Sequence, residues 1–120
     1  MKAAEATECA GQQGQFWPMH DVLFKNPRQF AEPQLVTYAQ ALQLDSAAFG
    51  RCLQGATTDK VRADAAAASA LGITGTPAFL VGTIQPDGRA KITERIVGAR
   101  PLSSFEIALD KVLESSAGTR

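Results

Sequence analysis

The stretch GITGTPAFLVG, residues 72–82, constrains the fold of this chain more than any other. An alanine-rich helical pattern ends where the stretch begins. Four apolar residues in succession, Ala78 to Val81, follow Pro77 and are typical of a β-strand covered on both faces. Proline cannot donate to a β-ladder, so at the mouth of a strand it indicates a specific turn, such as one with a cis Thr76–Pro77 bond. The sequence therefore predicts a change from helices to strands near residue 73.

Five segments before this point carry apolar residues at helical spacing. They predict helices over about 2–13, 16–24, 32–42, 46–53 and 58–72, with Asp45 as an N-cap of the fourth and Gly72 ending the fifth. The predicted inward faces carry Phe16, Met19, Leu23 and Phe24, then Leu35, Val36, Ala39 and Leu42, then Phe49, Cys52 and Leu53, and last a narrow stripe of Val61, Ala65, Ala68 and either Leu71 or Gly72.

The C-terminal third predicts a hairpin and one more helix. Residues 86–88, Pro-Asp-Gly, are a turn signal, and the return strand is expected within 91–97. Pro101 opens the last helix, and residues 115–120 are expected to fray. The expected apolar face of this helix is Leu102, Phe105, Leu109, Val112 and Leu113.

Length and composition indicate one soluble domain over residues 1–120, helical to about residue 72 and hairpin plus helix from about residue 73. Apolar residues make up 45% and charged residues 20% of the 120, which is ordinary for a globular protein. Twelve basic and twelve acidic side chains cancel, so neither nucleic acid nor an anionic membrane is an expected partner. The chain has a single histidine and no run of about 20 apolar residues, so neither a metal site nor a membrane span is expected.

Three blocks of sequence resemble successive parts of DsbA-like thioredoxin-fold proteins. They are ECAGQQGQFWPMHDVLF from residue 8, LGITGTPAFLVG from residue 71 and IVGARPLSSF from residue 96. The resemblance implies an α/β (α+β) fold: a partial thioredoxin-like fold with the DsbA-type helical insertion, a β-hairpin and a C-terminal helix. It also implies that Thr76 and Pro77 form the cis-proline loop that lines the substrate groove in this family of thiol-disulfide oxidoreductases.

The family's Cys-x-x-Cys motif is absent from these residues, and so are the strands that flank it. The only cysteines, Cys9 and Cys52, are 43 positions apart. Three interpretations remain open for them: free thiols packed as small apolar residues, a structural disulfide, or a redox-active pair. The resemblance places their two helices against one another, and we expect the cysteines to lie close in the fold.

Two classes of function follow. The first is a non-catalytic DsbA-like remnant that binds a peptide or protein, without a cofactor. The second is an oxidoreductase component that is completed by a partner chain or uses Cys9 and Cys52. By the resemblance, the strand Ala78, Phe79, Leu80 and Val81 lacks its usual neighbour, so we expect a homodimer through this edge. With no signal peptide the chain as written is expected in the cytoplasm, although family members are often exported.

Overall fold

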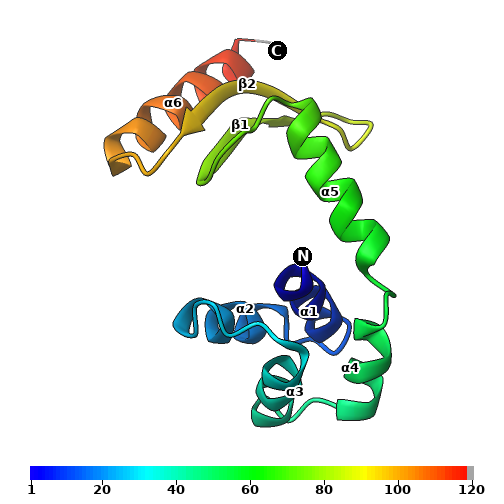
Figure 1. Cartoon of the computed structure of the whole chain (residues 1–120). Helices are drawn as coiled ribbons and strands as arrows, with labels where there is room; N and C mark the ends of the chain where they lie inside the picture. Colours follow the sequence, from blue (N-terminus) through cyan, green and yellow to red (C-terminus); the bar gives the residue numbers. More distant parts are fainter. Residues whose placement is uncertain (119–120) are drawn as a thin grey trace. The chain divides into compact units, whose positions relative to one another are not determined.

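The computed structural model describes residues 1–118, which divide into two compact units. The first unit is Met1–Ala67 and contains helices only, and the second, Ala68–Arg120, contains a β-hairpin and a helix (Figure 1). The mixed α+β class predicted from the sequence is confirmed. The prediction that the whole chain acts as one domain stays a prediction. Each unit is described by itself.

The first unit packs four short helices around one core and also contains most of a fifth helix. The helices are α1 (Lys2–Gly11), α2 (Phe16–Lys25), α3 (Glu32–Ala41), α4 (Ser46–Leu53) and α5 (Thr58–Ala70), the last of which runs into the second unit. The buried apolar residues come from α1, from the predicted faces of α2 to α4 and from the loop before α4: Ala6, Cys9, Ala10, Met19, Leu23, Leu35, Ala39, Leu44, Phe49, Cys52 and Leu53.

Local signals explain where these helices begin and turn. The Asp45 side chain accepts a 2.9 Å hydrogen bond from the Ala48 amide, and so caps α4 as predicted. Pro33 lies in the first turn of α3, where its missing N–H leaves no helical bond unmade. Gly14 has φ +74° between α1 and α2, a backbone conformation that glycine adopts without steric cost.

Two predicted inward faces in this unit are wrong in part. Phe24 was placed in the core but its side chain is 76% exposed, because it follows buried Leu23 by only 100° around α2 and turns away when Met19 and Leu23 face inward. Helix α5 ends at Ala70, before Gly72, and none of its side chains is buried. Its predicted stripe is built mainly from single methyl groups, which offer too little apolar area to form a buried face.

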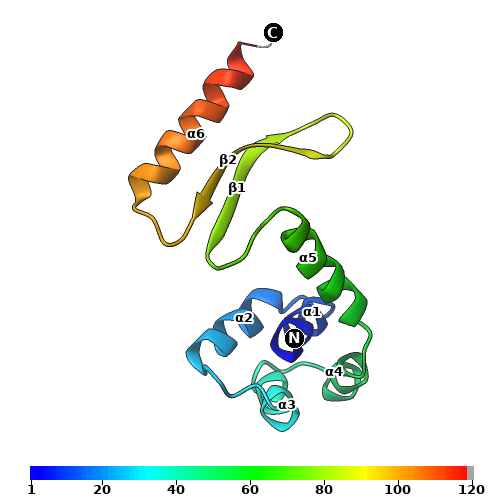
Figure 2. The ribbon, with the colours of Figure 1, turned by 45° about the horizontal axis from the view of Figure 1, so that its top comes forward.

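The second unit is an antiparallel hairpin with one helix on it. Strand β1 (Ala78–Ile84) pairs with β2 (Ala90–Val97), and α6 (Leu102–Ala117) lies beside the hairpin (Figure 2). Phe79 of β1 meets Phe105 of α6 edge to face, with ring centroids 4.9 Å apart. The Arg95 guanidinium donates a hydrogen bond to the Leu71 carbonyl and so ties the incoming segment to β2.

The predicted burial of β1 on both faces is wrong. No residue of β1 is fully buried, the strand continues to Ile84, and Phe79 is 41% exposed. The reason is that, within residues 1–118, only β2 pairs with β1 and only α6 packs on the hairpin. The return strand and the turn before it form where the sequence predicted them.

The apolar face of α6 is also narrower than predicted. Ala108 and Val112 are buried and Phe105 is half-buried, while Leu102, Leu109 and Leu113 are exposed. The hairpin has only two strands and covers one narrow row of residues along α6. The second apolar row of the helix therefore remains exposed. The helix continues to Ala117, beyond the predicted start of fraying, and residues 119–120 lie outside the described part.

Candidate functional site

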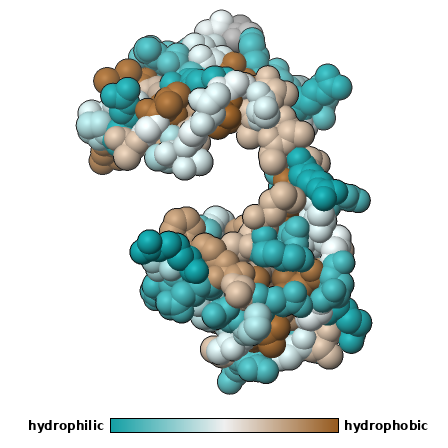
Figure 3. All heavy atoms as spheres, viewed as in Figure 1, coloured by the Kyte–Doolittle hydropathy of each residue, from teal (hydrophilic) through white to brown (hydrophobic). Residues whose placement is uncertain are grey.

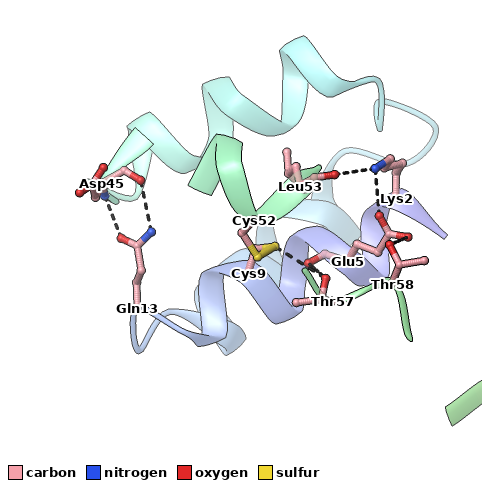
Figure 4. The surroundings of a disulfide bond; sticks show 9 residues. All are labelled: Lys2, Glu5, Cys9, Gln13, Asp45, Cys52, Leu53, Thr57 and Thr58. Atoms are coloured by element: carbon pink, nitrogen blue, oxygen red, sulfur yellow. Dashed lines mark hydrogen bonds and ion pairs between the residues drawn. A yellow bond between two sulfur atoms is a disulfide. The ribbon is translucent and has the colours of Figure 1, made fainter. Parts of the chain in front are cut away.

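The two cysteines form a disulfide that joins α1 to α4 (Figure 4). The Cα atoms of Cys9 and Cys52 are 5.8 Å apart, and the residues are 1% and 6% exposed. The expected proximity of the two is therefore confirmed. Of the three interpretations, the structure has the disulfide, and neither cysteine is left as a free thiol. Thiol-disulfide exchange depends on access to a sulfur atom, and both cysteines of this pair are buried.

A group of polar residues beside the disulfide, here called the clamp, joins α1 to α4 and to the start of α5. The Lys2 ammonium donates a 2.7 Å hydrogen bond to the Leu53 carbonyl and lies 3.0 Å from a carboxylate oxygen of buried Glu5 (Figure 4). Thr58 donates to the other oxygen of Glu5, and Thr57 donates to the Glu5 carbonyl. The hydrogen bond from Lys2 is the main cause of the lowered pKa of Glu5. The Lys2–Glu5 pair lies within α1, and the other bonds join α1 to the end of α4 and to the start of α5.

The predicted groove residues lie in the second unit, whereas the disulfide belongs to the first. The Thr76–Pro77 peptide bond is cis, and both side chains are exposed. The Pro77 carbonyl accepts a 2.8 Å hydrogen bond from the Gly98 amide, which fixes this turn against the end of β2. The turn therefore presents Thr76 and Pro77 at the surface from a backbone anchored in the hairpin.

An apolar pocket of about 650 Å³ opens in the first unit. Its walls come from α1, α2, the α2–α3 connection and the first half of α5. The lining residues are Ala3, Ala4, Thr7, Glu8, Phe16, His20, Leu23, Phe24, Pro27, Phe30, Val61 and Asp64. Its volume lies in the range of ordinary ligand pockets, which are also mostly apolar with a few polar groups.

Aromatic side chains continue along α2 beside this pocket. The rings of Phe16, Trp17, His20 and Phe24 contact one another in sequence, with successive centroids 5.1, 5.2 and 4.6 Å apart. Trp17 and Phe24 are largely exposed, so apolar surface extends past the pocket mouth. Figure 3 shows apolar residues, in tan to brown, at the surface of this unit. A contiguous patch of exposed apolar surface of this kind often marks a binding site.

This pocket was not predicted from the sequence, because the helical spacing of Phe16 and Phe24 indicated that both lie in the core. A signal was present, since the apolar residues of α2, from Met19 around to Trp17, span about 160° of the helix circumference, which is wider than one buried stripe of about 100°.

Charge at the pocket rim is partly neutralised. The Lys60 ammonium lies 2.8 Å from Glu8 and 3.0 Å from Asp64, and both carboxylates line the pocket. Their hydrogen bonds, that of Glu8 first, raise the pKa of Lys60. With two carboxylates sharing one cation, the rim has no excess of positive charge that would attract an anion.

The predicted edge residues Ala78, Phe79, Leu80 and Val81 lie on a strand with a single partner. Within residues 1–118 the sheet has two strands, so the side of β1 opposite β2 has no backbone partner.

Within the same range, no cluster of three or more metal-ligating side chains is found. No helix in the described part of the chain is long and apolar enough to cross a membrane.

Comparison with known proteins identifies the class to which this architecture belongs. A family model described as DSBA-like thioredoxin domain matches residues 1–110. The chain therefore belongs to the DSBA-like thioredoxin domain family, as the sequence blocks implied.

The relatives found among curated proteins are Na(+)/H(+) antiporters. The chain is 35% identical to NhaA 3 of Salinispora tropica over 109 residues, which are 88% of this chain and 16% of the relative. It is 34% identical to NhaA 1 of Salinispora arenicola over 108 residues, again 16% of the relative, and 39% identical to NhaA of Herminiimonas arsenicoxydans over 80 residues, or 66% of this chain and 13% of the relative. This chain thus spans less than a fifth of the length of these relatives. No solved structure matches it.

Proposed function

We propose that these 120 residues act as a non-catalytic DSBA-like module that binds an apolar segment of a polypeptide. The observation that carries the proposal is the state of the cysteines: the only two in the chain are joined to each other and enclosed in the helical core. Disulfide exchange by these residues would need a nucleophilic thiolate, which they do not supply. Sodium–proton exchange, named for relatives of much greater length, is not part of this proposal.

The pocket beside α2 supports a polypeptide ligand. Its apolar lining would favour an aliphatic or aromatic side chain, and a volume of about 650 Å³ would hold one or two of them. Because the exposed ring of Trp17 carries the apolar surface beyond the pocket lining, the ligand is expected to continue outside the pocket, as a peptide does and a small molecule does not. By the family resemblance, Thr76 and Pro77 are a second candidate contact for an extended peptide.

An insulin-reduction assay with dithiothreitol tests the non-catalytic part of the proposal. We expect the protein to leave the rate of insulin precipitation at the level of dithiothreitol alone, and the Cys9→Ala/Cys52→Ala double variant to behave in the same way. A rate above that background that is lost in the double variant would overturn the proposal.

Fluorescence of Trp17, the only tryptophan, tests the binding part. Its ring contacts Phe16 and His20, both of which line the pocket, so an occupied pocket should shift its emission to shorter wavelength. The probes are short peptides with one central Phe or Leu, and the same peptides with Ser at that position. We expect saturable shifts with the apolar peptides only.

A matched pair of surface variants controls for general stickiness. Phe24→Ser removes an exposed ring at the pocket, while Leu113→Ser removes a comparably exposed side chain in the second unit. We expect the first to weaken peptide binding at least tenfold and the second to leave it unchanged. Equal loss in both variants, or equal binding of the Ser peptides, would contradict a specific pocket.

The alternative function is an oxidoreductase component whose Cys-x-x-Cys is provided by another segment or chain. The observation that favours it is the exposed Thr76–Pro77 turn, which the resemblance assigns to the substrate groove. Thr76→Arg would then impair turnover of the completed assembly, whereas it would not change the Trp17 response to peptides in the first unit.

A further inference from the structure

We propose that the second unit pairs with a second copy of this chain through the free edge of β1. The product is a four-stranded antiparallel sheet with a two-fold axis at Val81. This inference concerns the hairpin alone and does not depend on the function proposed for the helical pocket.

Hydrogen bonds at both ends of β1 show which of its residues face β2. The Pro77 carbonyl accepts from the Gly98 amide, and the Gln85 amide donates to the Arg89 carbonyl, each at 2.8 Å. In an antiparallel ladder the backbone groups of alternate residues point to the same side, so the odd-numbered residues from 77 to 85 face β2. The one irregularity in register passes over Thr93 of β2 and therefore does not interrupt the alternation on β1.

The even-numbered residues consequently face the free edge. Ala78, Leu80, Gly82 and Ile84 direct their N–H and C=O groups away from β2. Pro77, which lacks an N–H, belongs to the side that faces β2, and the extra residue in the ladder belongs to β2 as well. The free edge therefore has a complete row of donors and acceptors, with none of the prolines, bulges or lysines that normally block strand pairing.

Self-pairing of this edge is sterically and electrostatically permitted. A two-fold axis at Val81 sets Leu80 opposite Gly82 and Ala78 opposite Ile84 as hydrogen-bonded pairs, since all four residues face outward. It sets Phe79 opposite Thr83 on the face that carries α6. All seven residues of β1 are uncharged, so no like charges meet in this arrangement.

The second unit also needs more packing than it has by itself. Its fully buried apolar residues within the described range are Ile96, Ala108 and Val112. A two-stranded hairpin with so small an interior is only marginally stable, and additional strands are the usual remedy. A second copy of this chain is the partner that the edge favours. About a two-fold axis at Val81, the backbone donors and acceptors of one uncharged β1 strand meet the acceptors and donors of the other.

Light scattering of the chain tests the dimer, with one variant designed to break it. Leu80→Glu places two carboxylates near the axis of the dimer, yet within one copy the new glutamate lies opposite Arg95, a favourable cross-strand pair. Leu102→Glu is the control, because Leu102 is 72% exposed and lies on α6. We expect a mass of twice 12.7 kDa for the wild type and the control at micromolar concentration, and 12.7 kDa for Leu80→Glu.

Amide hydrogen exchange gives a residue-level signature that does not depend on any variant. The amides of Leu80 and Gly82 should gain at least tenfold protection as protein concentration rises, while those of Phe79 and Val81, already bonded to β2, should not change. A wild type that remains at 12.7 kDa would overturn the proposal, and slow exchange at Leu80 in that monomer would show that another segment of the chain covers the edge. A dimer that survives Leu80→Glu would equally exclude this interface.

Discussion

The side chain of Gln13 pairs with both backbone groups of Asp45, 32 positions away in the sequence. Its Nε2 donates to the Asp45 carbonyl at 3.2 Å, and its Oε1 accepts from the Asp45 amide at 2.8 Å (Figure 4). Asp45 is the residue whose side chain caps α4. A glutamine just beyond α1 therefore positions the N-cap of another helix, and fixes how α4 approaches the disulfide.

Replacing Gln13 should loosen this arrangement. Gln13→Ala removes two hydrogen bonds at a partly exposed site and is expected to lower the free energy of unfolding by about 1–2 kcal/mol. Urea denaturation followed by circular dichroism measures the change. Gln12→Ala, at an exposed glutamine one position earlier, should shift stability by less than about 0.5 kcal/mol. Equal effects of the two variants would show that the pairing contributes nothing.

Loss of the disulfide should destabilise the helical unit. A crosslink between residues 43 positions apart removes chain entropy worth about 4 kcal/mol in the unfolded state. The Cys9→Ala/Cys52→Ala variant is therefore expected to unfold at markedly lower urea concentration, as should the wild type in dithiothreitol. The variant itself should not respond to dithiothreitol. Thiol titration should find no reactive thiol in the native protein and two after reduction in denaturant.

Gly82 is required by a close backbone approach between the two strands. A Cβ built on Gly82 would lie only 2.0 Å from the Lys91 carbonyl oxygen, so Gly82→Ala must push the strands apart. We expect the free energy of unfolding to fall by about 1–3 kcal/mol and amide exchange to become faster throughout the hairpin. Gly75→Ala is the control, since a Cβ there meets no atom within 4 Å. A Gly82→Ala protein as stable as this control would refute the close approach.

Acid should weaken the clamp around Glu5. Its pKa is lowered in the folded state, chiefly by the hydrogen bond from Lys2 and despite the opposing effect of burial. The stabilisation is therefore complete above the ordinary glutamate pKa of about 4.3 and is lost as pH falls through the lower folded value. Urea midpoints of the wild type should decline over this range, and those of Glu5→Gln should decline less. Glu106→Gln, at an exposed glutamate on α6, should follow the wild type.

The sequence by itself determined the local elements and the family. Helical spacing located α1 to α4, Asp45 marked the start of α4, and the Pro-Asp-Gly turn located the hairpin. Each of these signals acts within a few residues, through a cap, a turn or the period of one face, so it can be read without knowing what lies opposite.

Only the tertiary structure decided the pairing and the exposure of side chains. The sequence left open whether Cys9 is a free thiol, and the contact between α1 and α4 showed that it forms a disulfide. The sequence also predicted Phe24 in the core, whereas Met19 and Leu23 fill the inward face of α2. Likewise, the apolar run of β1 does not tell which of its sides finds a partner. Whether a side chain is buried depends on how much surface distant segments of the chain pack against it. The residues next to it in the sequence do not determine that contact.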